Sequence, residues 1–205
     1  MRHAPSEETN LASSPASRDH DRPITPAGAL AAAAVARALA ARGWLPDLVL
    51  ASDAARSRQT LAAMAVAVPA LGDAPAFFRG ALYTAAALDG QTAPALAAAL
   101  EEAGAGGGGA AGDAAATAGA PPPTTTTPTT VLALGHNKGW EEAASALAGC
   151  AVRLEAASAA LLEVSSGGGA DGATTASPAF TSWPAALAGG EGDWTLVGLV
   201  SGADV

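Results

Sequence analysis

The sequence predicts one α/β domain in which helices cover both faces of a sheet. Short apolar runs with the length of buried strands alternate along the chain with longer alanine-rich stretches that carry helix start and stop signals. The chain has 205 residues, of which 59 are Ala, so the large apolar residues that fill a core make up only about a fifth of it. A core this lean suits a single domain, and we expect residues 1–205 to form one.

The first helix and the first strand have clear local signals. Thr25 has a side chain that can cap a helix, Pro26 suits the first helical position, and Gly43 can end the helix. Residues 47–52 follow Pro46 as a short apolar run that is typical of a buried strand. We therefore expect a helix between Thr25 and Gly43, followed by a strand.

The rest of the chain continues this alternation. Further helices are expected over residues 54–68, 93–103 and 141–148. Further strands are expected over residues 131–134, 159–164 and 194–200. In sheets of this kind the ligand sites lie at the carboxyl ends of the strands, so reactive side chains are expected there.

Two segments differ from the rest in composition. Residues 104–130 run from Gly and Ala through Pro to Thr, with almost nothing to bury, and we expect a disordered insertion. Residues 165–192 form a second segment that we expect to be loose. The four glycines at 106–109 are not followed by Gly-Lys-Ser/Thr, so they are not expected to form a phosphate-binding loop.

Composition and charge exclude several classes of protein. A net charge of −9 disfavours binding to nucleic acid or to anionic membranes. A single cysteine excludes an internal disulfide framework and a thiolate metal cluster, and three histidines leave little material for a multi-histidine metal site. We expect neither a metal nor a cofactor. The chain has no long apolar run and its opening, with Glu7 and Glu8, is neither a signal nor a transit peptide. We expect a soluble intracellular protein.

The polar residues that follow the predicted strands suggest chemistry when they are taken together. His136 comes directly after the strand at 131–134, Arg56 follows the strand that ends at Ser52, and His3 follows Arg2 at the head of the chain. Each is a weak signal alone, because single histidines and arginines are usually packed or solvated. Their order along the chain is more specific.

Four short motifs follow one another: Arg2-His3-Ala4; Asp21-Arg22-Pro23-Ile24-Thr25 with Gly28; Ser52 with Arg56 and Gln59-Thr60; and Gly135-His136-Asn137. This set resembles the histidine phosphatase superfamily, which is phosphoglycerate mutase-like, and especially its SixA-type phosphohistidine phosphatase branch. Residues 18–59 and 135–149 look like plant and algal members. The resemblance implies a three-layer phosphoglycerate mutase-like sheet with helices on both faces.

The resemblance also implies roles for the motif residues. His3 matches the family nucleophile, which attacks phosphorus and becomes phosphohistidine for a time, and which must therefore be neutral with a free lone pair. Arg2 and Arg56 match the arginines that clamp phosphate oxygens. His136 matches the second histidine of the pocket, which donates to the phosphoryl group. A helix that begins near Gly139 is expected to point its positive end toward the same site.

Other polar and aromatic residues are less strongly indicated as site residues. Arg22 is expected to fix the entry loop, with substrate contact as the lesser alternative. The remaining residues are expected to be structural, with His20 solvated, Ser52 and Asn137 shaping turns, and Trp140, Trp183, Trp194 and Cys150 packed.

Larger members of the family, which act on alkyl phosphates, carry an acidic proton donor in the middle of the chain. This sequence has no convincing match to that residue, and Asp89 is a weak candidate. An alkoxide leaving group, whose conjugate acid has a pKa of roughly 15, needs a proton as it departs, whereas an imidazole near 6.5 needs far less help. This favours phosphohistidine as the substrate, although aryl and acyl phosphates fit as well.

The second departure concerns the first strand. Family members place the Arg-His pair at the end of an apolar strand in the middle of the sheet, but here Met1 directly precedes Arg2. We expect that strand to be missing. Two explanations stay open: the sequence is a truncated reading of a longer gene, which we favour, or the protein has lost the precise positioning of its nucleophile.

The predicted function is a phosphatase that needs no cofactor and forms a phosphohistidine intermediate. Its expected partners are a phosphorylated protein or a small phosphorylated molecule. The alternatives are a noncatalytic phosphate- or phosphoprotein-binding domain and, less favoured, a phosphoglycerate mutase-type phosphotransferase. The resemblance to plant members also leaves a chloroplast location open.

Overall fold

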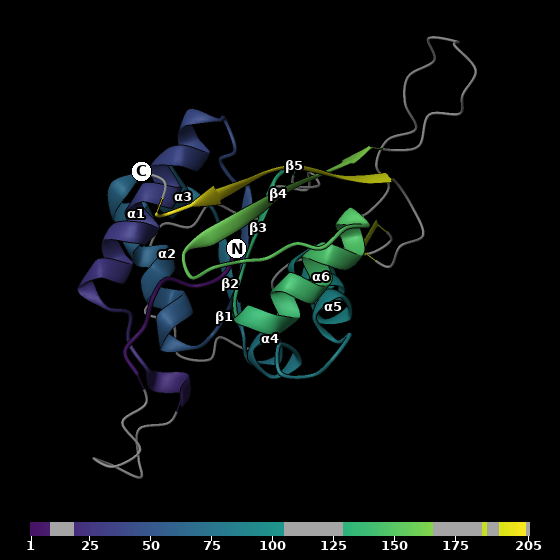
Figure 1. The fold of residues 1–205 in the computed structure, drawn as a ribbon, viewed down its shortest axis with the longest axis horizontal. Helices are drawn as coiled ribbons and strands as arrows, with labels where there is room; N and C mark the ends of the chain where they lie inside the picture. Colours follow the sequence, from purple (N-terminus) through teal and green to yellow (C-terminus); the bar gives the residue numbers. More distant parts are fainter. Residues whose placement is uncertain (9–18, 105–128, 166–185, 188–192, 204–205) are drawn as a thin grey trace.

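A computed structural model describes residues 1–8, 19–104, 129–165, 186–187 and 193–203. The segments predicted to be loose, at 104–130 and 165–192, fall mostly outside these residues. Figure 1 shows strands in the middle of the molecule with helices on either side. The predicted α/β class with three layers is therefore confirmed.

The centre of the sheet is the short buried strand β1 (Leu48–Ser52). It pairs in parallel with β2 (Ala76–Arg79) on one side and with β3 (Val131–Leu134) on the other. A second ladder consists of the antiparallel strands β4 (Ser158–Ser165) and β5 (Asp193–Ser201).

The first three residues join these two ladders. Arg2 forms a parallel bridge with Gly135, just beyond β3, and an antiparallel bridge with Ser158, at the start of β4. The spatial order is therefore β2, β1, β3, the segment Met1–His3, β4 and β5. Among the described residues, Met1–His3 takes the central position of this order through isolated bridges and is not part of a named strand.

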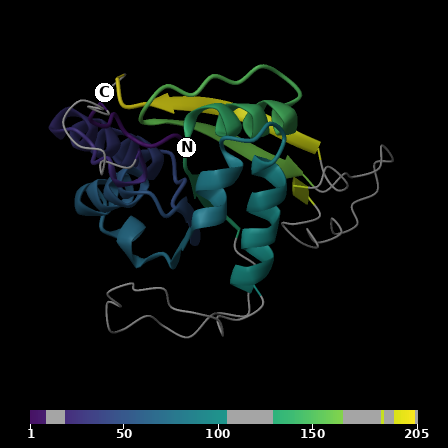
Figure 2. The ribbon, with the colours of Figure 1, turned by 90° about the horizontal axis from the view of Figure 1, so that it is seen from below.

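Helices cover the two faces of the sheet. One face carries α1 (Pro26–Ala41), α2 (Ala55–Ala67) and α3 (Ala70–Asp73), and the other carries α4 (Gly80–Ala85), α5 (Thr92–Gly104) and α6 (Asn137–Ala148). Figure 2 shows the two groups from below.

Alternate side chains of β1 separate the core into two layers. Val49 and Ala51 pack in the cluster that includes α1 and α2, whereas Leu48 and Leu50 pack in the cluster that includes α5 and α6. This is the period of two that a strand imposes. Because both faces of β1 are covered, all five of its residues are buried, as its apolar sequence predicts.

Most predicted elements are found close to their expected bounds, with some differences. α1 begins as expected, because Thr25 Oγ1 accepts a hydrogen bond of 2.9 Å from the Gly28 N–H. The last predicted helix begins earlier than residue 141, at Asn137, with His136 as its N-cap. The elements β2, α3 and α4 were not predicted.

Residues expected to be packed have mixed outcomes. Trp140 is buried on α6, as predicted. Cys150 is exposed, so its predicted burial is wrong; it follows Gly149, which ends α6 in a left-handed conformation and turns the chain outward. Trp183 lies outside the described residues.

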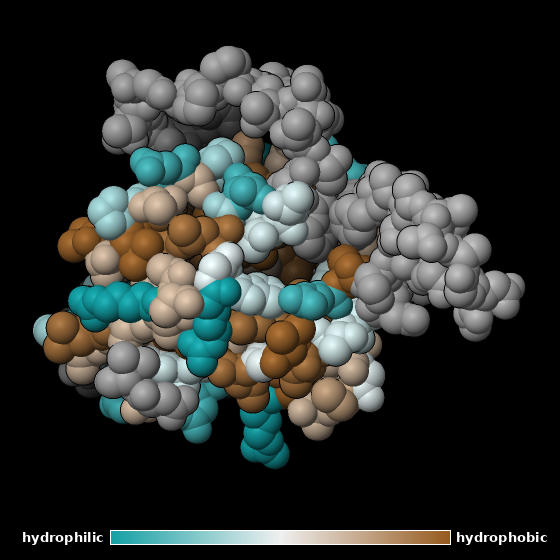
Figure 3. Space-filling view, turned by 90° about the horizontal axis from the view of Figure 1, so that it is seen from above, coloured by the Kyte–Doolittle hydropathy of each residue, from teal (hydrophilic) through white to brown (hydrophobic). Residues whose placement is uncertain are grey.

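Apolar side chains also reach the surface. Figure 3 shows them between hydrophilic ones on the face seen from above. The large apolar side chains that are at least half exposed are Leu30, Val66, Leu88, Val197 and Leu199. Within the described part of the chain, no helix is both long and apolar enough to cross a membrane.

Candidate active site

The N-terminal segment Met1–His3 lies between β3 and β4 and fixes the position of His3. The His3 N–H donates to the Gly135 carbonyl at 2.8 Å, and the His3 carbonyl accepts from the Ala157 N–H at 3.0 Å. Arg2 is held in the same way by Ser158, whose carbonyl accepts from the Arg2 N–H at 2.9 Å. The backbone of the predicted nucleophile is therefore fixed on both sides.

The contacts of the His3 ring determine which nitrogen carries a lone pair. His3 Nδ1 lies 2.7 Å from the Ala4 carbonyl, which can only accept, so Nδ1 carries the proton. His3 Nε2 lies 3.1 Å from Nε of Arg56, which can only donate. Nε2 is therefore the nitrogen with a lone pair, and it is the one that faces the other site residues.

Arg56 connects the two histidines. It lies in the first turn of α2, is only 5% exposed, and directs Nη2 to Nδ1 of His136 at 3.1 Å. One guanidinium thus reaches His3 and His136 at the same time. The structure brings together these three residues, which the sequence analysis selected from positions far apart in the chain.

His136 has the opposite proton arrangement to His3. Its Nδ1 accepts from Arg56, so the ring proton is on Nε2, which donates to Ser52 Oγ at 2.8 Å. The same Ser52 oxygen accepts from the Ala54 N–H at 3.3 Å. Ser52 therefore shapes the turn after β1, as expected, and also orients His136, which the sequence analysis did not predict.

Both histidines are kept neutral by their surroundings. Burial lowers the pKa of His3 to about 4, and the nearby charges of Arg56, Arg2 and Arg22 act in the same direction. Burial and the Arg56 charge lower the pKa of His136 to about 3. Each ring can therefore use a lone pair at neutral pH.

These groups line a pocket of about 440 Å³. Arg2, Arg22 and Arg56 supply three guanidinium groups to its wall, and Asn137 lies at the first position of α6. Arg2 Nη1 donates to the Leu154 carbonyl at 3.0 Å, while its buried Nε has no hydrogen-bond partner among the described residues. The pocket thus concentrates positive charge in an acidic protein, and Arg22, expected chiefly to fix the entry loop, is part of its wall.

Two residues that the sequence analysis did not select lie against Arg56. Asp19, in the short helix η1 (Asp19–Asp21), accepts hydrogen bonds of 2.9 Å on Oδ2 from Arg56 Nη2 and from the Tyr83 hydroxyl. The Tyr83 ring also packs edge-on against His136, with centroids 5.1 Å apart. Burial raises the pKa of Asp19, but the bonds from Tyr83 and Arg56 outweigh it and hold that pKa below its usual value.

Asp89 and His20 lie outside the pocket wall. Asp89 is fully exposed and forms an ion pair of 2.7 Å with Lys138. His20, expected to be solvated, instead lies 2.9 Å from Asp53 Oδ1 and contacts the Tyr83 ring. The structure does not bring Asp89 to His3 and His136.

Glycines of the motifs allow the close approaches that the site needs. A Cβ on Gly135 would lie 2.4 Å from the Trp140 ring, and one on Gly28 would lie 2.2 Å from the Pro5 carbonyl oxygen. Gly135 therefore lets the segment that positions His136 pass directly over Trp140. Gly28 lets the start of α1 pack against the loop after His3.

The described residues contain no group of three or more His, Cys, Asp or Glu side chains placed to hold a metal ion. The residues that line the pocket include three arginines and two histidines, together with Ser6 and Asn137. This set suits a small anion.

Comparisons with known proteins agree with this geometry. Residues 1–72 match the model of the histidine phosphatase superfamily (branch 1). The Arabidopsis thaliana chloroplastic protein At3g52155 is 37% identical over 203 residues, a match that covers 98% of this chain and 75% of that protein. A structure of the protein histidine phosphatase SixA complexed with tungstate shares the fold, with a TM-score of 0.60 at 17% identity, and the match covers 100% of this chain and 96% of that one. The chain belongs to the histidine phosphatase superfamily.

Proposed function

We propose that this chain is a phosphatase in which Nε2 of His3 attacks phosphorus. The observation that carries the proposal is a buried imidazole nitrogen with a lone pair, 3.1 Å from Arg56 Nε in a pocket lined by three arginines. Membership of the histidine phosphatase superfamily supports phosphatase-type chemistry. The nucleophile and the identity of the substrate are our inference.

The reaction has two steps. In the first, a bond forms between His3 Nε2 and phosphorus while the bond from phosphorus to the leaving group breaks, and the leaving group takes up a proton. In the second, water attacks the phosphohistidine, the N–P bond breaks, and inorganic phosphate leaves. The proton that water gives up balances the one taken by the leaving group, so His3 is restored.

The cationic groups stabilise the transferring phosphoryl group. Arg2, Arg22 and Arg56 offer N–H donors to its oxygens, in the wall of the pocket. A bound phosphate dianion would also raise the pKa of His136 from its lowered value, because a nearby negative charge favours the protonated ring. For Arg56, a bond to the phosphoryl group would replace its hydrogen bond to Asp19 Oδ2, which keeps the bond from the Tyr83 hydroxyl.

The carboxylates near the site favour a substrate whose leaving group needs little protonation. Asp19 is bound to Arg56 and Tyr83 and its pKa is lowered, so it is ionised and has no proton to give. Asp89 is exposed and paired with Lys138. We therefore propose a phosphohistidine, in a protein or peptide, or an aryl phosphate as the substrate in preference to an alkyl phosphate.

The test is phosphate release from a phosphohistidine peptide, an aryl phosphate and an alkyl phosphate. We expect the first two to be hydrolysed and the third to be at least about a hundred times slower. His3→Ala is expected to abolish turnover, whereas the matched variant His20→Ala, outside the pocket wall, is expected to keep it. Circular dichroism checks that both variants fold.

The outcome separates this proposal from its rivals. If the folded chain releases no phosphate but binds tungstate in a way that needs Arg56, the noncatalytic binding domain is favoured. If it moves phosphate between positions of a sugar acid only when a bisphosphorylated cofactor is added, the phosphotransferase is favoured. A trapped phosphoenzyme that is labile in acid and absent in His3→Ala supports the phosphatase.

A further inference from the structure

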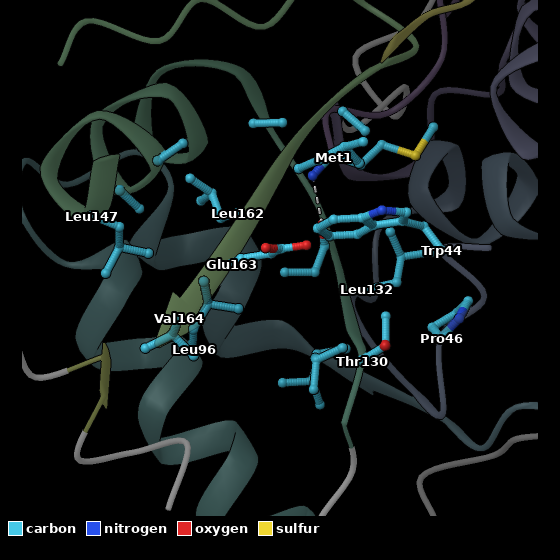
Figure 4. A pocket seen from close by; sticks show the side chains of 18 of the residues that line it. Met1, Trp44, Pro46, Leu96, Thr130, Leu132, Leu147, Leu162, Glu163 and Val164 are labelled. Carbon is cyan, nitrogen blue, oxygen red and sulfur yellow. Dashed lines mark hydrogen bonds between the residues drawn. The ribbon is translucent and has the colours of Figure 1, made fainter. Parts of the chain in front are cut away.

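Two cavities among the described residues differ in charge. The larger one, of about 760 Å³, is lined mainly by apolar side chains such as Leu132 and Leu162 (Figure 4). The charged side chains among its described lining residues are Arg42 and Glu163, which have opposite signs. The smaller pocket carries three arginines instead. A phosphate is therefore expected in the smaller pocket, where any group that competes for the arginines affects how tightly the anion is held.

One carboxylate bridges two of these arginines. Asp19 Oδ2 accepts from Arg56 Nη2 at 2.9 Å, and Asp19 Oδ1 lies 3.2 Å from Arg22 Nε. Although burial raises the pKa of Asp19, the bonds from Tyr83 and Arg56 hold that pKa below its usual value, so the carboxylate is charged at neutral pH. Asp19 therefore offsets part of the positive charge that attracts a phosphate to the pocket.

Tyr83 gives this carboxylate a partner outside the pocket wall. Its hydroxyl donates at 2.9 Å to Oδ2 of Asp19, the oxygen that also accepts from Arg56. The Tyr83 ring lies edge-on to the rings of His20 and His136, with centroids 5.1 Å apart in both cases, and these contacts fix the position of the hydroxyl. When a phosphate takes the place of Asp19 on Arg56, the carboxylate still has the bond from Tyr83.

Arg56 has other contacts that hold it in place without the Asp19 carboxylate. Its Nη1 donates to the backbone carbonyl of Asp19, and its Nε lies 3.1 Å from Nε2 of His3. The Arg56 residue is also only 5% exposed. The effect of the Asp19 side chain on the pocket is therefore chiefly one of charge.

Phosphate and the Asp19 carboxylate compete for the same guanidinium donors. A pocket with three arginines binds the product of phosphoryl transfer strongly, and slow product release limits turnover in many enzymes. A phosphate that enters this pocket must replace an existing charge-assisted bond, which reduces its net binding free energy. The return of Asp19 to Arg56 favours release of the product in the same way.

We propose that Asp19 is an internal competitor of inorganic phosphate, supported by Tyr83, and that this pair determines how readily the pocket releases its product. Tyr83 acts through Asp19 and is a positioning residue. The inference rests on the proposed function in one respect, since the pocket must take up a phosphate anion. Binding can therefore test it without turnover.

The test measures the dissociation constant of inorganic phosphate by calorimetry at neutral pH and constant ionic strength. Asp19→Asn keeps the size of the side chain and removes its charge, so we expect phosphate to bind about fivefold more tightly or better. Tyr83→Phe leaves the carboxylate more dependent on the arginines, so we expect binding to weaken by about threefold. In the double variant the loss of the Tyr83 hydroxyl should have little further effect, because its partner charge is absent.

Asp21→Asn is the matched control. Asp21 lies in the same short helix η1 and carries the same charge, but its side chain is 67% exposed and contacts His20. We expect this variant to change phosphate binding by less than about twofold, because solvent and salt screen an exposed charge. The Asp19 side chain is itself 45% exposed, so Asp19→Asn is expected to fold, and circular dichroism checks every variant.

The direction of the changes decides the outcome. Weaker binding in both Asp19→Asn and Tyr83→Phe would overturn the proposal, because it would show that the pair holds Arg56 in position for the anion. Equal tightening in Asp21→Asn and Asp19→Asn would overturn it as well, since net charge alone would explain the effect. So would the absence of phosphate binding in all of these proteins. The expected order of affinities in a chain that hydrolyses none of the phosphorylated substrates would support this inference and contradict the proposed phosphatase.

Discussion

At the scale of single residues, the site depends on how the two histidines are oriented. Ser52 Oγ accepts a hydrogen bond from the Nε2–H of His136 and so leaves Nδ1 to face Arg56. We expect Ser52→Ala to release the ring, lower kcat by about tenfold and cost about 1 kcal/mol of unfolding free energy. The check is kcat together with ¹⁵N chemical shifts of the His136 ring, which report its tautomer.

Ser57 supplies the matched control. Its side chain is also fully buried, and its Oγ has no hydrogen-bond partner among the described residues. Ser57→Ala is expected to leave kcat and the His136 shifts unchanged. Equal losses in the two variants would mean that Ser52 acts only through packing.

The neutral histidines also make stability depend on pH. The pKa values of His3 and His136 lie at about 4 and about 3, below the ordinary value of 6.5, so the unfolded chain binds more protons as the solution becomes acidic. Their contribution is complete above pH 6.5 and is lost as the pH falls toward these lower values. Each unit of pKa displacement corresponds to about 1.4 kcal/mol.

We therefore expect the unfolding free energy to fall between pH 6.5 and pH 4, and to fall less in the double variant His3→Gln, His136→Gln. Urea titrations across this range measure it. His20→Gln should keep the full slope, because the pKa of His20 is raised by its hydrogen bond to Asp53 and does not contribute in this direction. An unchanged slope in the double variant would contradict the prediction.

At the scale of elements, local signals allowed α1 and β1 to be predicted, but not β2. The bounds of α1 follow from Thr25, Pro26 and Gly43, because each of them starts or ends the helix through contacts with residues close to it in sequence. Ala76 in β2 is exposed and the other three residues are only partly buried, and they form a strand because they pair with β1. A strand that forms because it pairs with a distant segment has few signals in its own residues, so β2 could not be predicted from them.

The same distinction applies to the site. The sequence selected His3, Arg56 and His136 as candidates because each belongs to a short motif of neighbouring residues. The contact of Asp19 with Arg56 joins residues 37 positions apart and depends on how η1 packs against α2. Nothing in the residues around Asp19 indicates that contact, so it became visible only in the folded chain.

The approach of β3 to α6 gives a prediction at this scale. A Cβ on Gly135 would lie within 2.4 Å of the Trp140 ring, so we expect Gly135→Ala to destabilise the protein by about 1–3 kcal/mol and to lower activity by displacing His136. Gly198→Ala in β5, where no atom lies within 4 Å, is the matched control and is expected to be nearly neutral.

A second variant tests whether Gly135→Ala acts by crowding the Trp140 ring or by a general effect on the backbone. Shortening the ring with Trp140→Phe removes the atoms that the added methyl group would meet, so the double variant should be less destabilised than the sum of the two single variants. Chemical denaturation measures all four proteins. Additive losses would show that the Trp140 ring is not the cause.

At the scale of the whole molecule, the two core clusters share one sheet, so the domain is expected to unfold in a single transition. The insertion is expected to contribute little to the stability of the domain. Residues 105–128 are composed mainly of Ala, Gly, Thr and Pro, with few groups that could fill a core. The strand that follows is anchored separately, because Asp47 Oδ2 accepts bonds from the N–H groups of Thr129 and Thr130.

We therefore expect replacement of residues 105–128 by an eight-residue glycine-serine linker to preserve the fold and the site. Each halving of a loop lowers its closure cost by about 0.6 kcal/mol, so the melting temperature should stay constant or rise slightly. Far-ultraviolet circular dichroism and tryptophan fluorescence should report the same midpoint, and phosphate release should match that of the intact chain. A fall of more than a few degrees, or two separate midpoints, would show that these residues stabilise the domain, because the anchor at Asp47 is retained in the shortened protein.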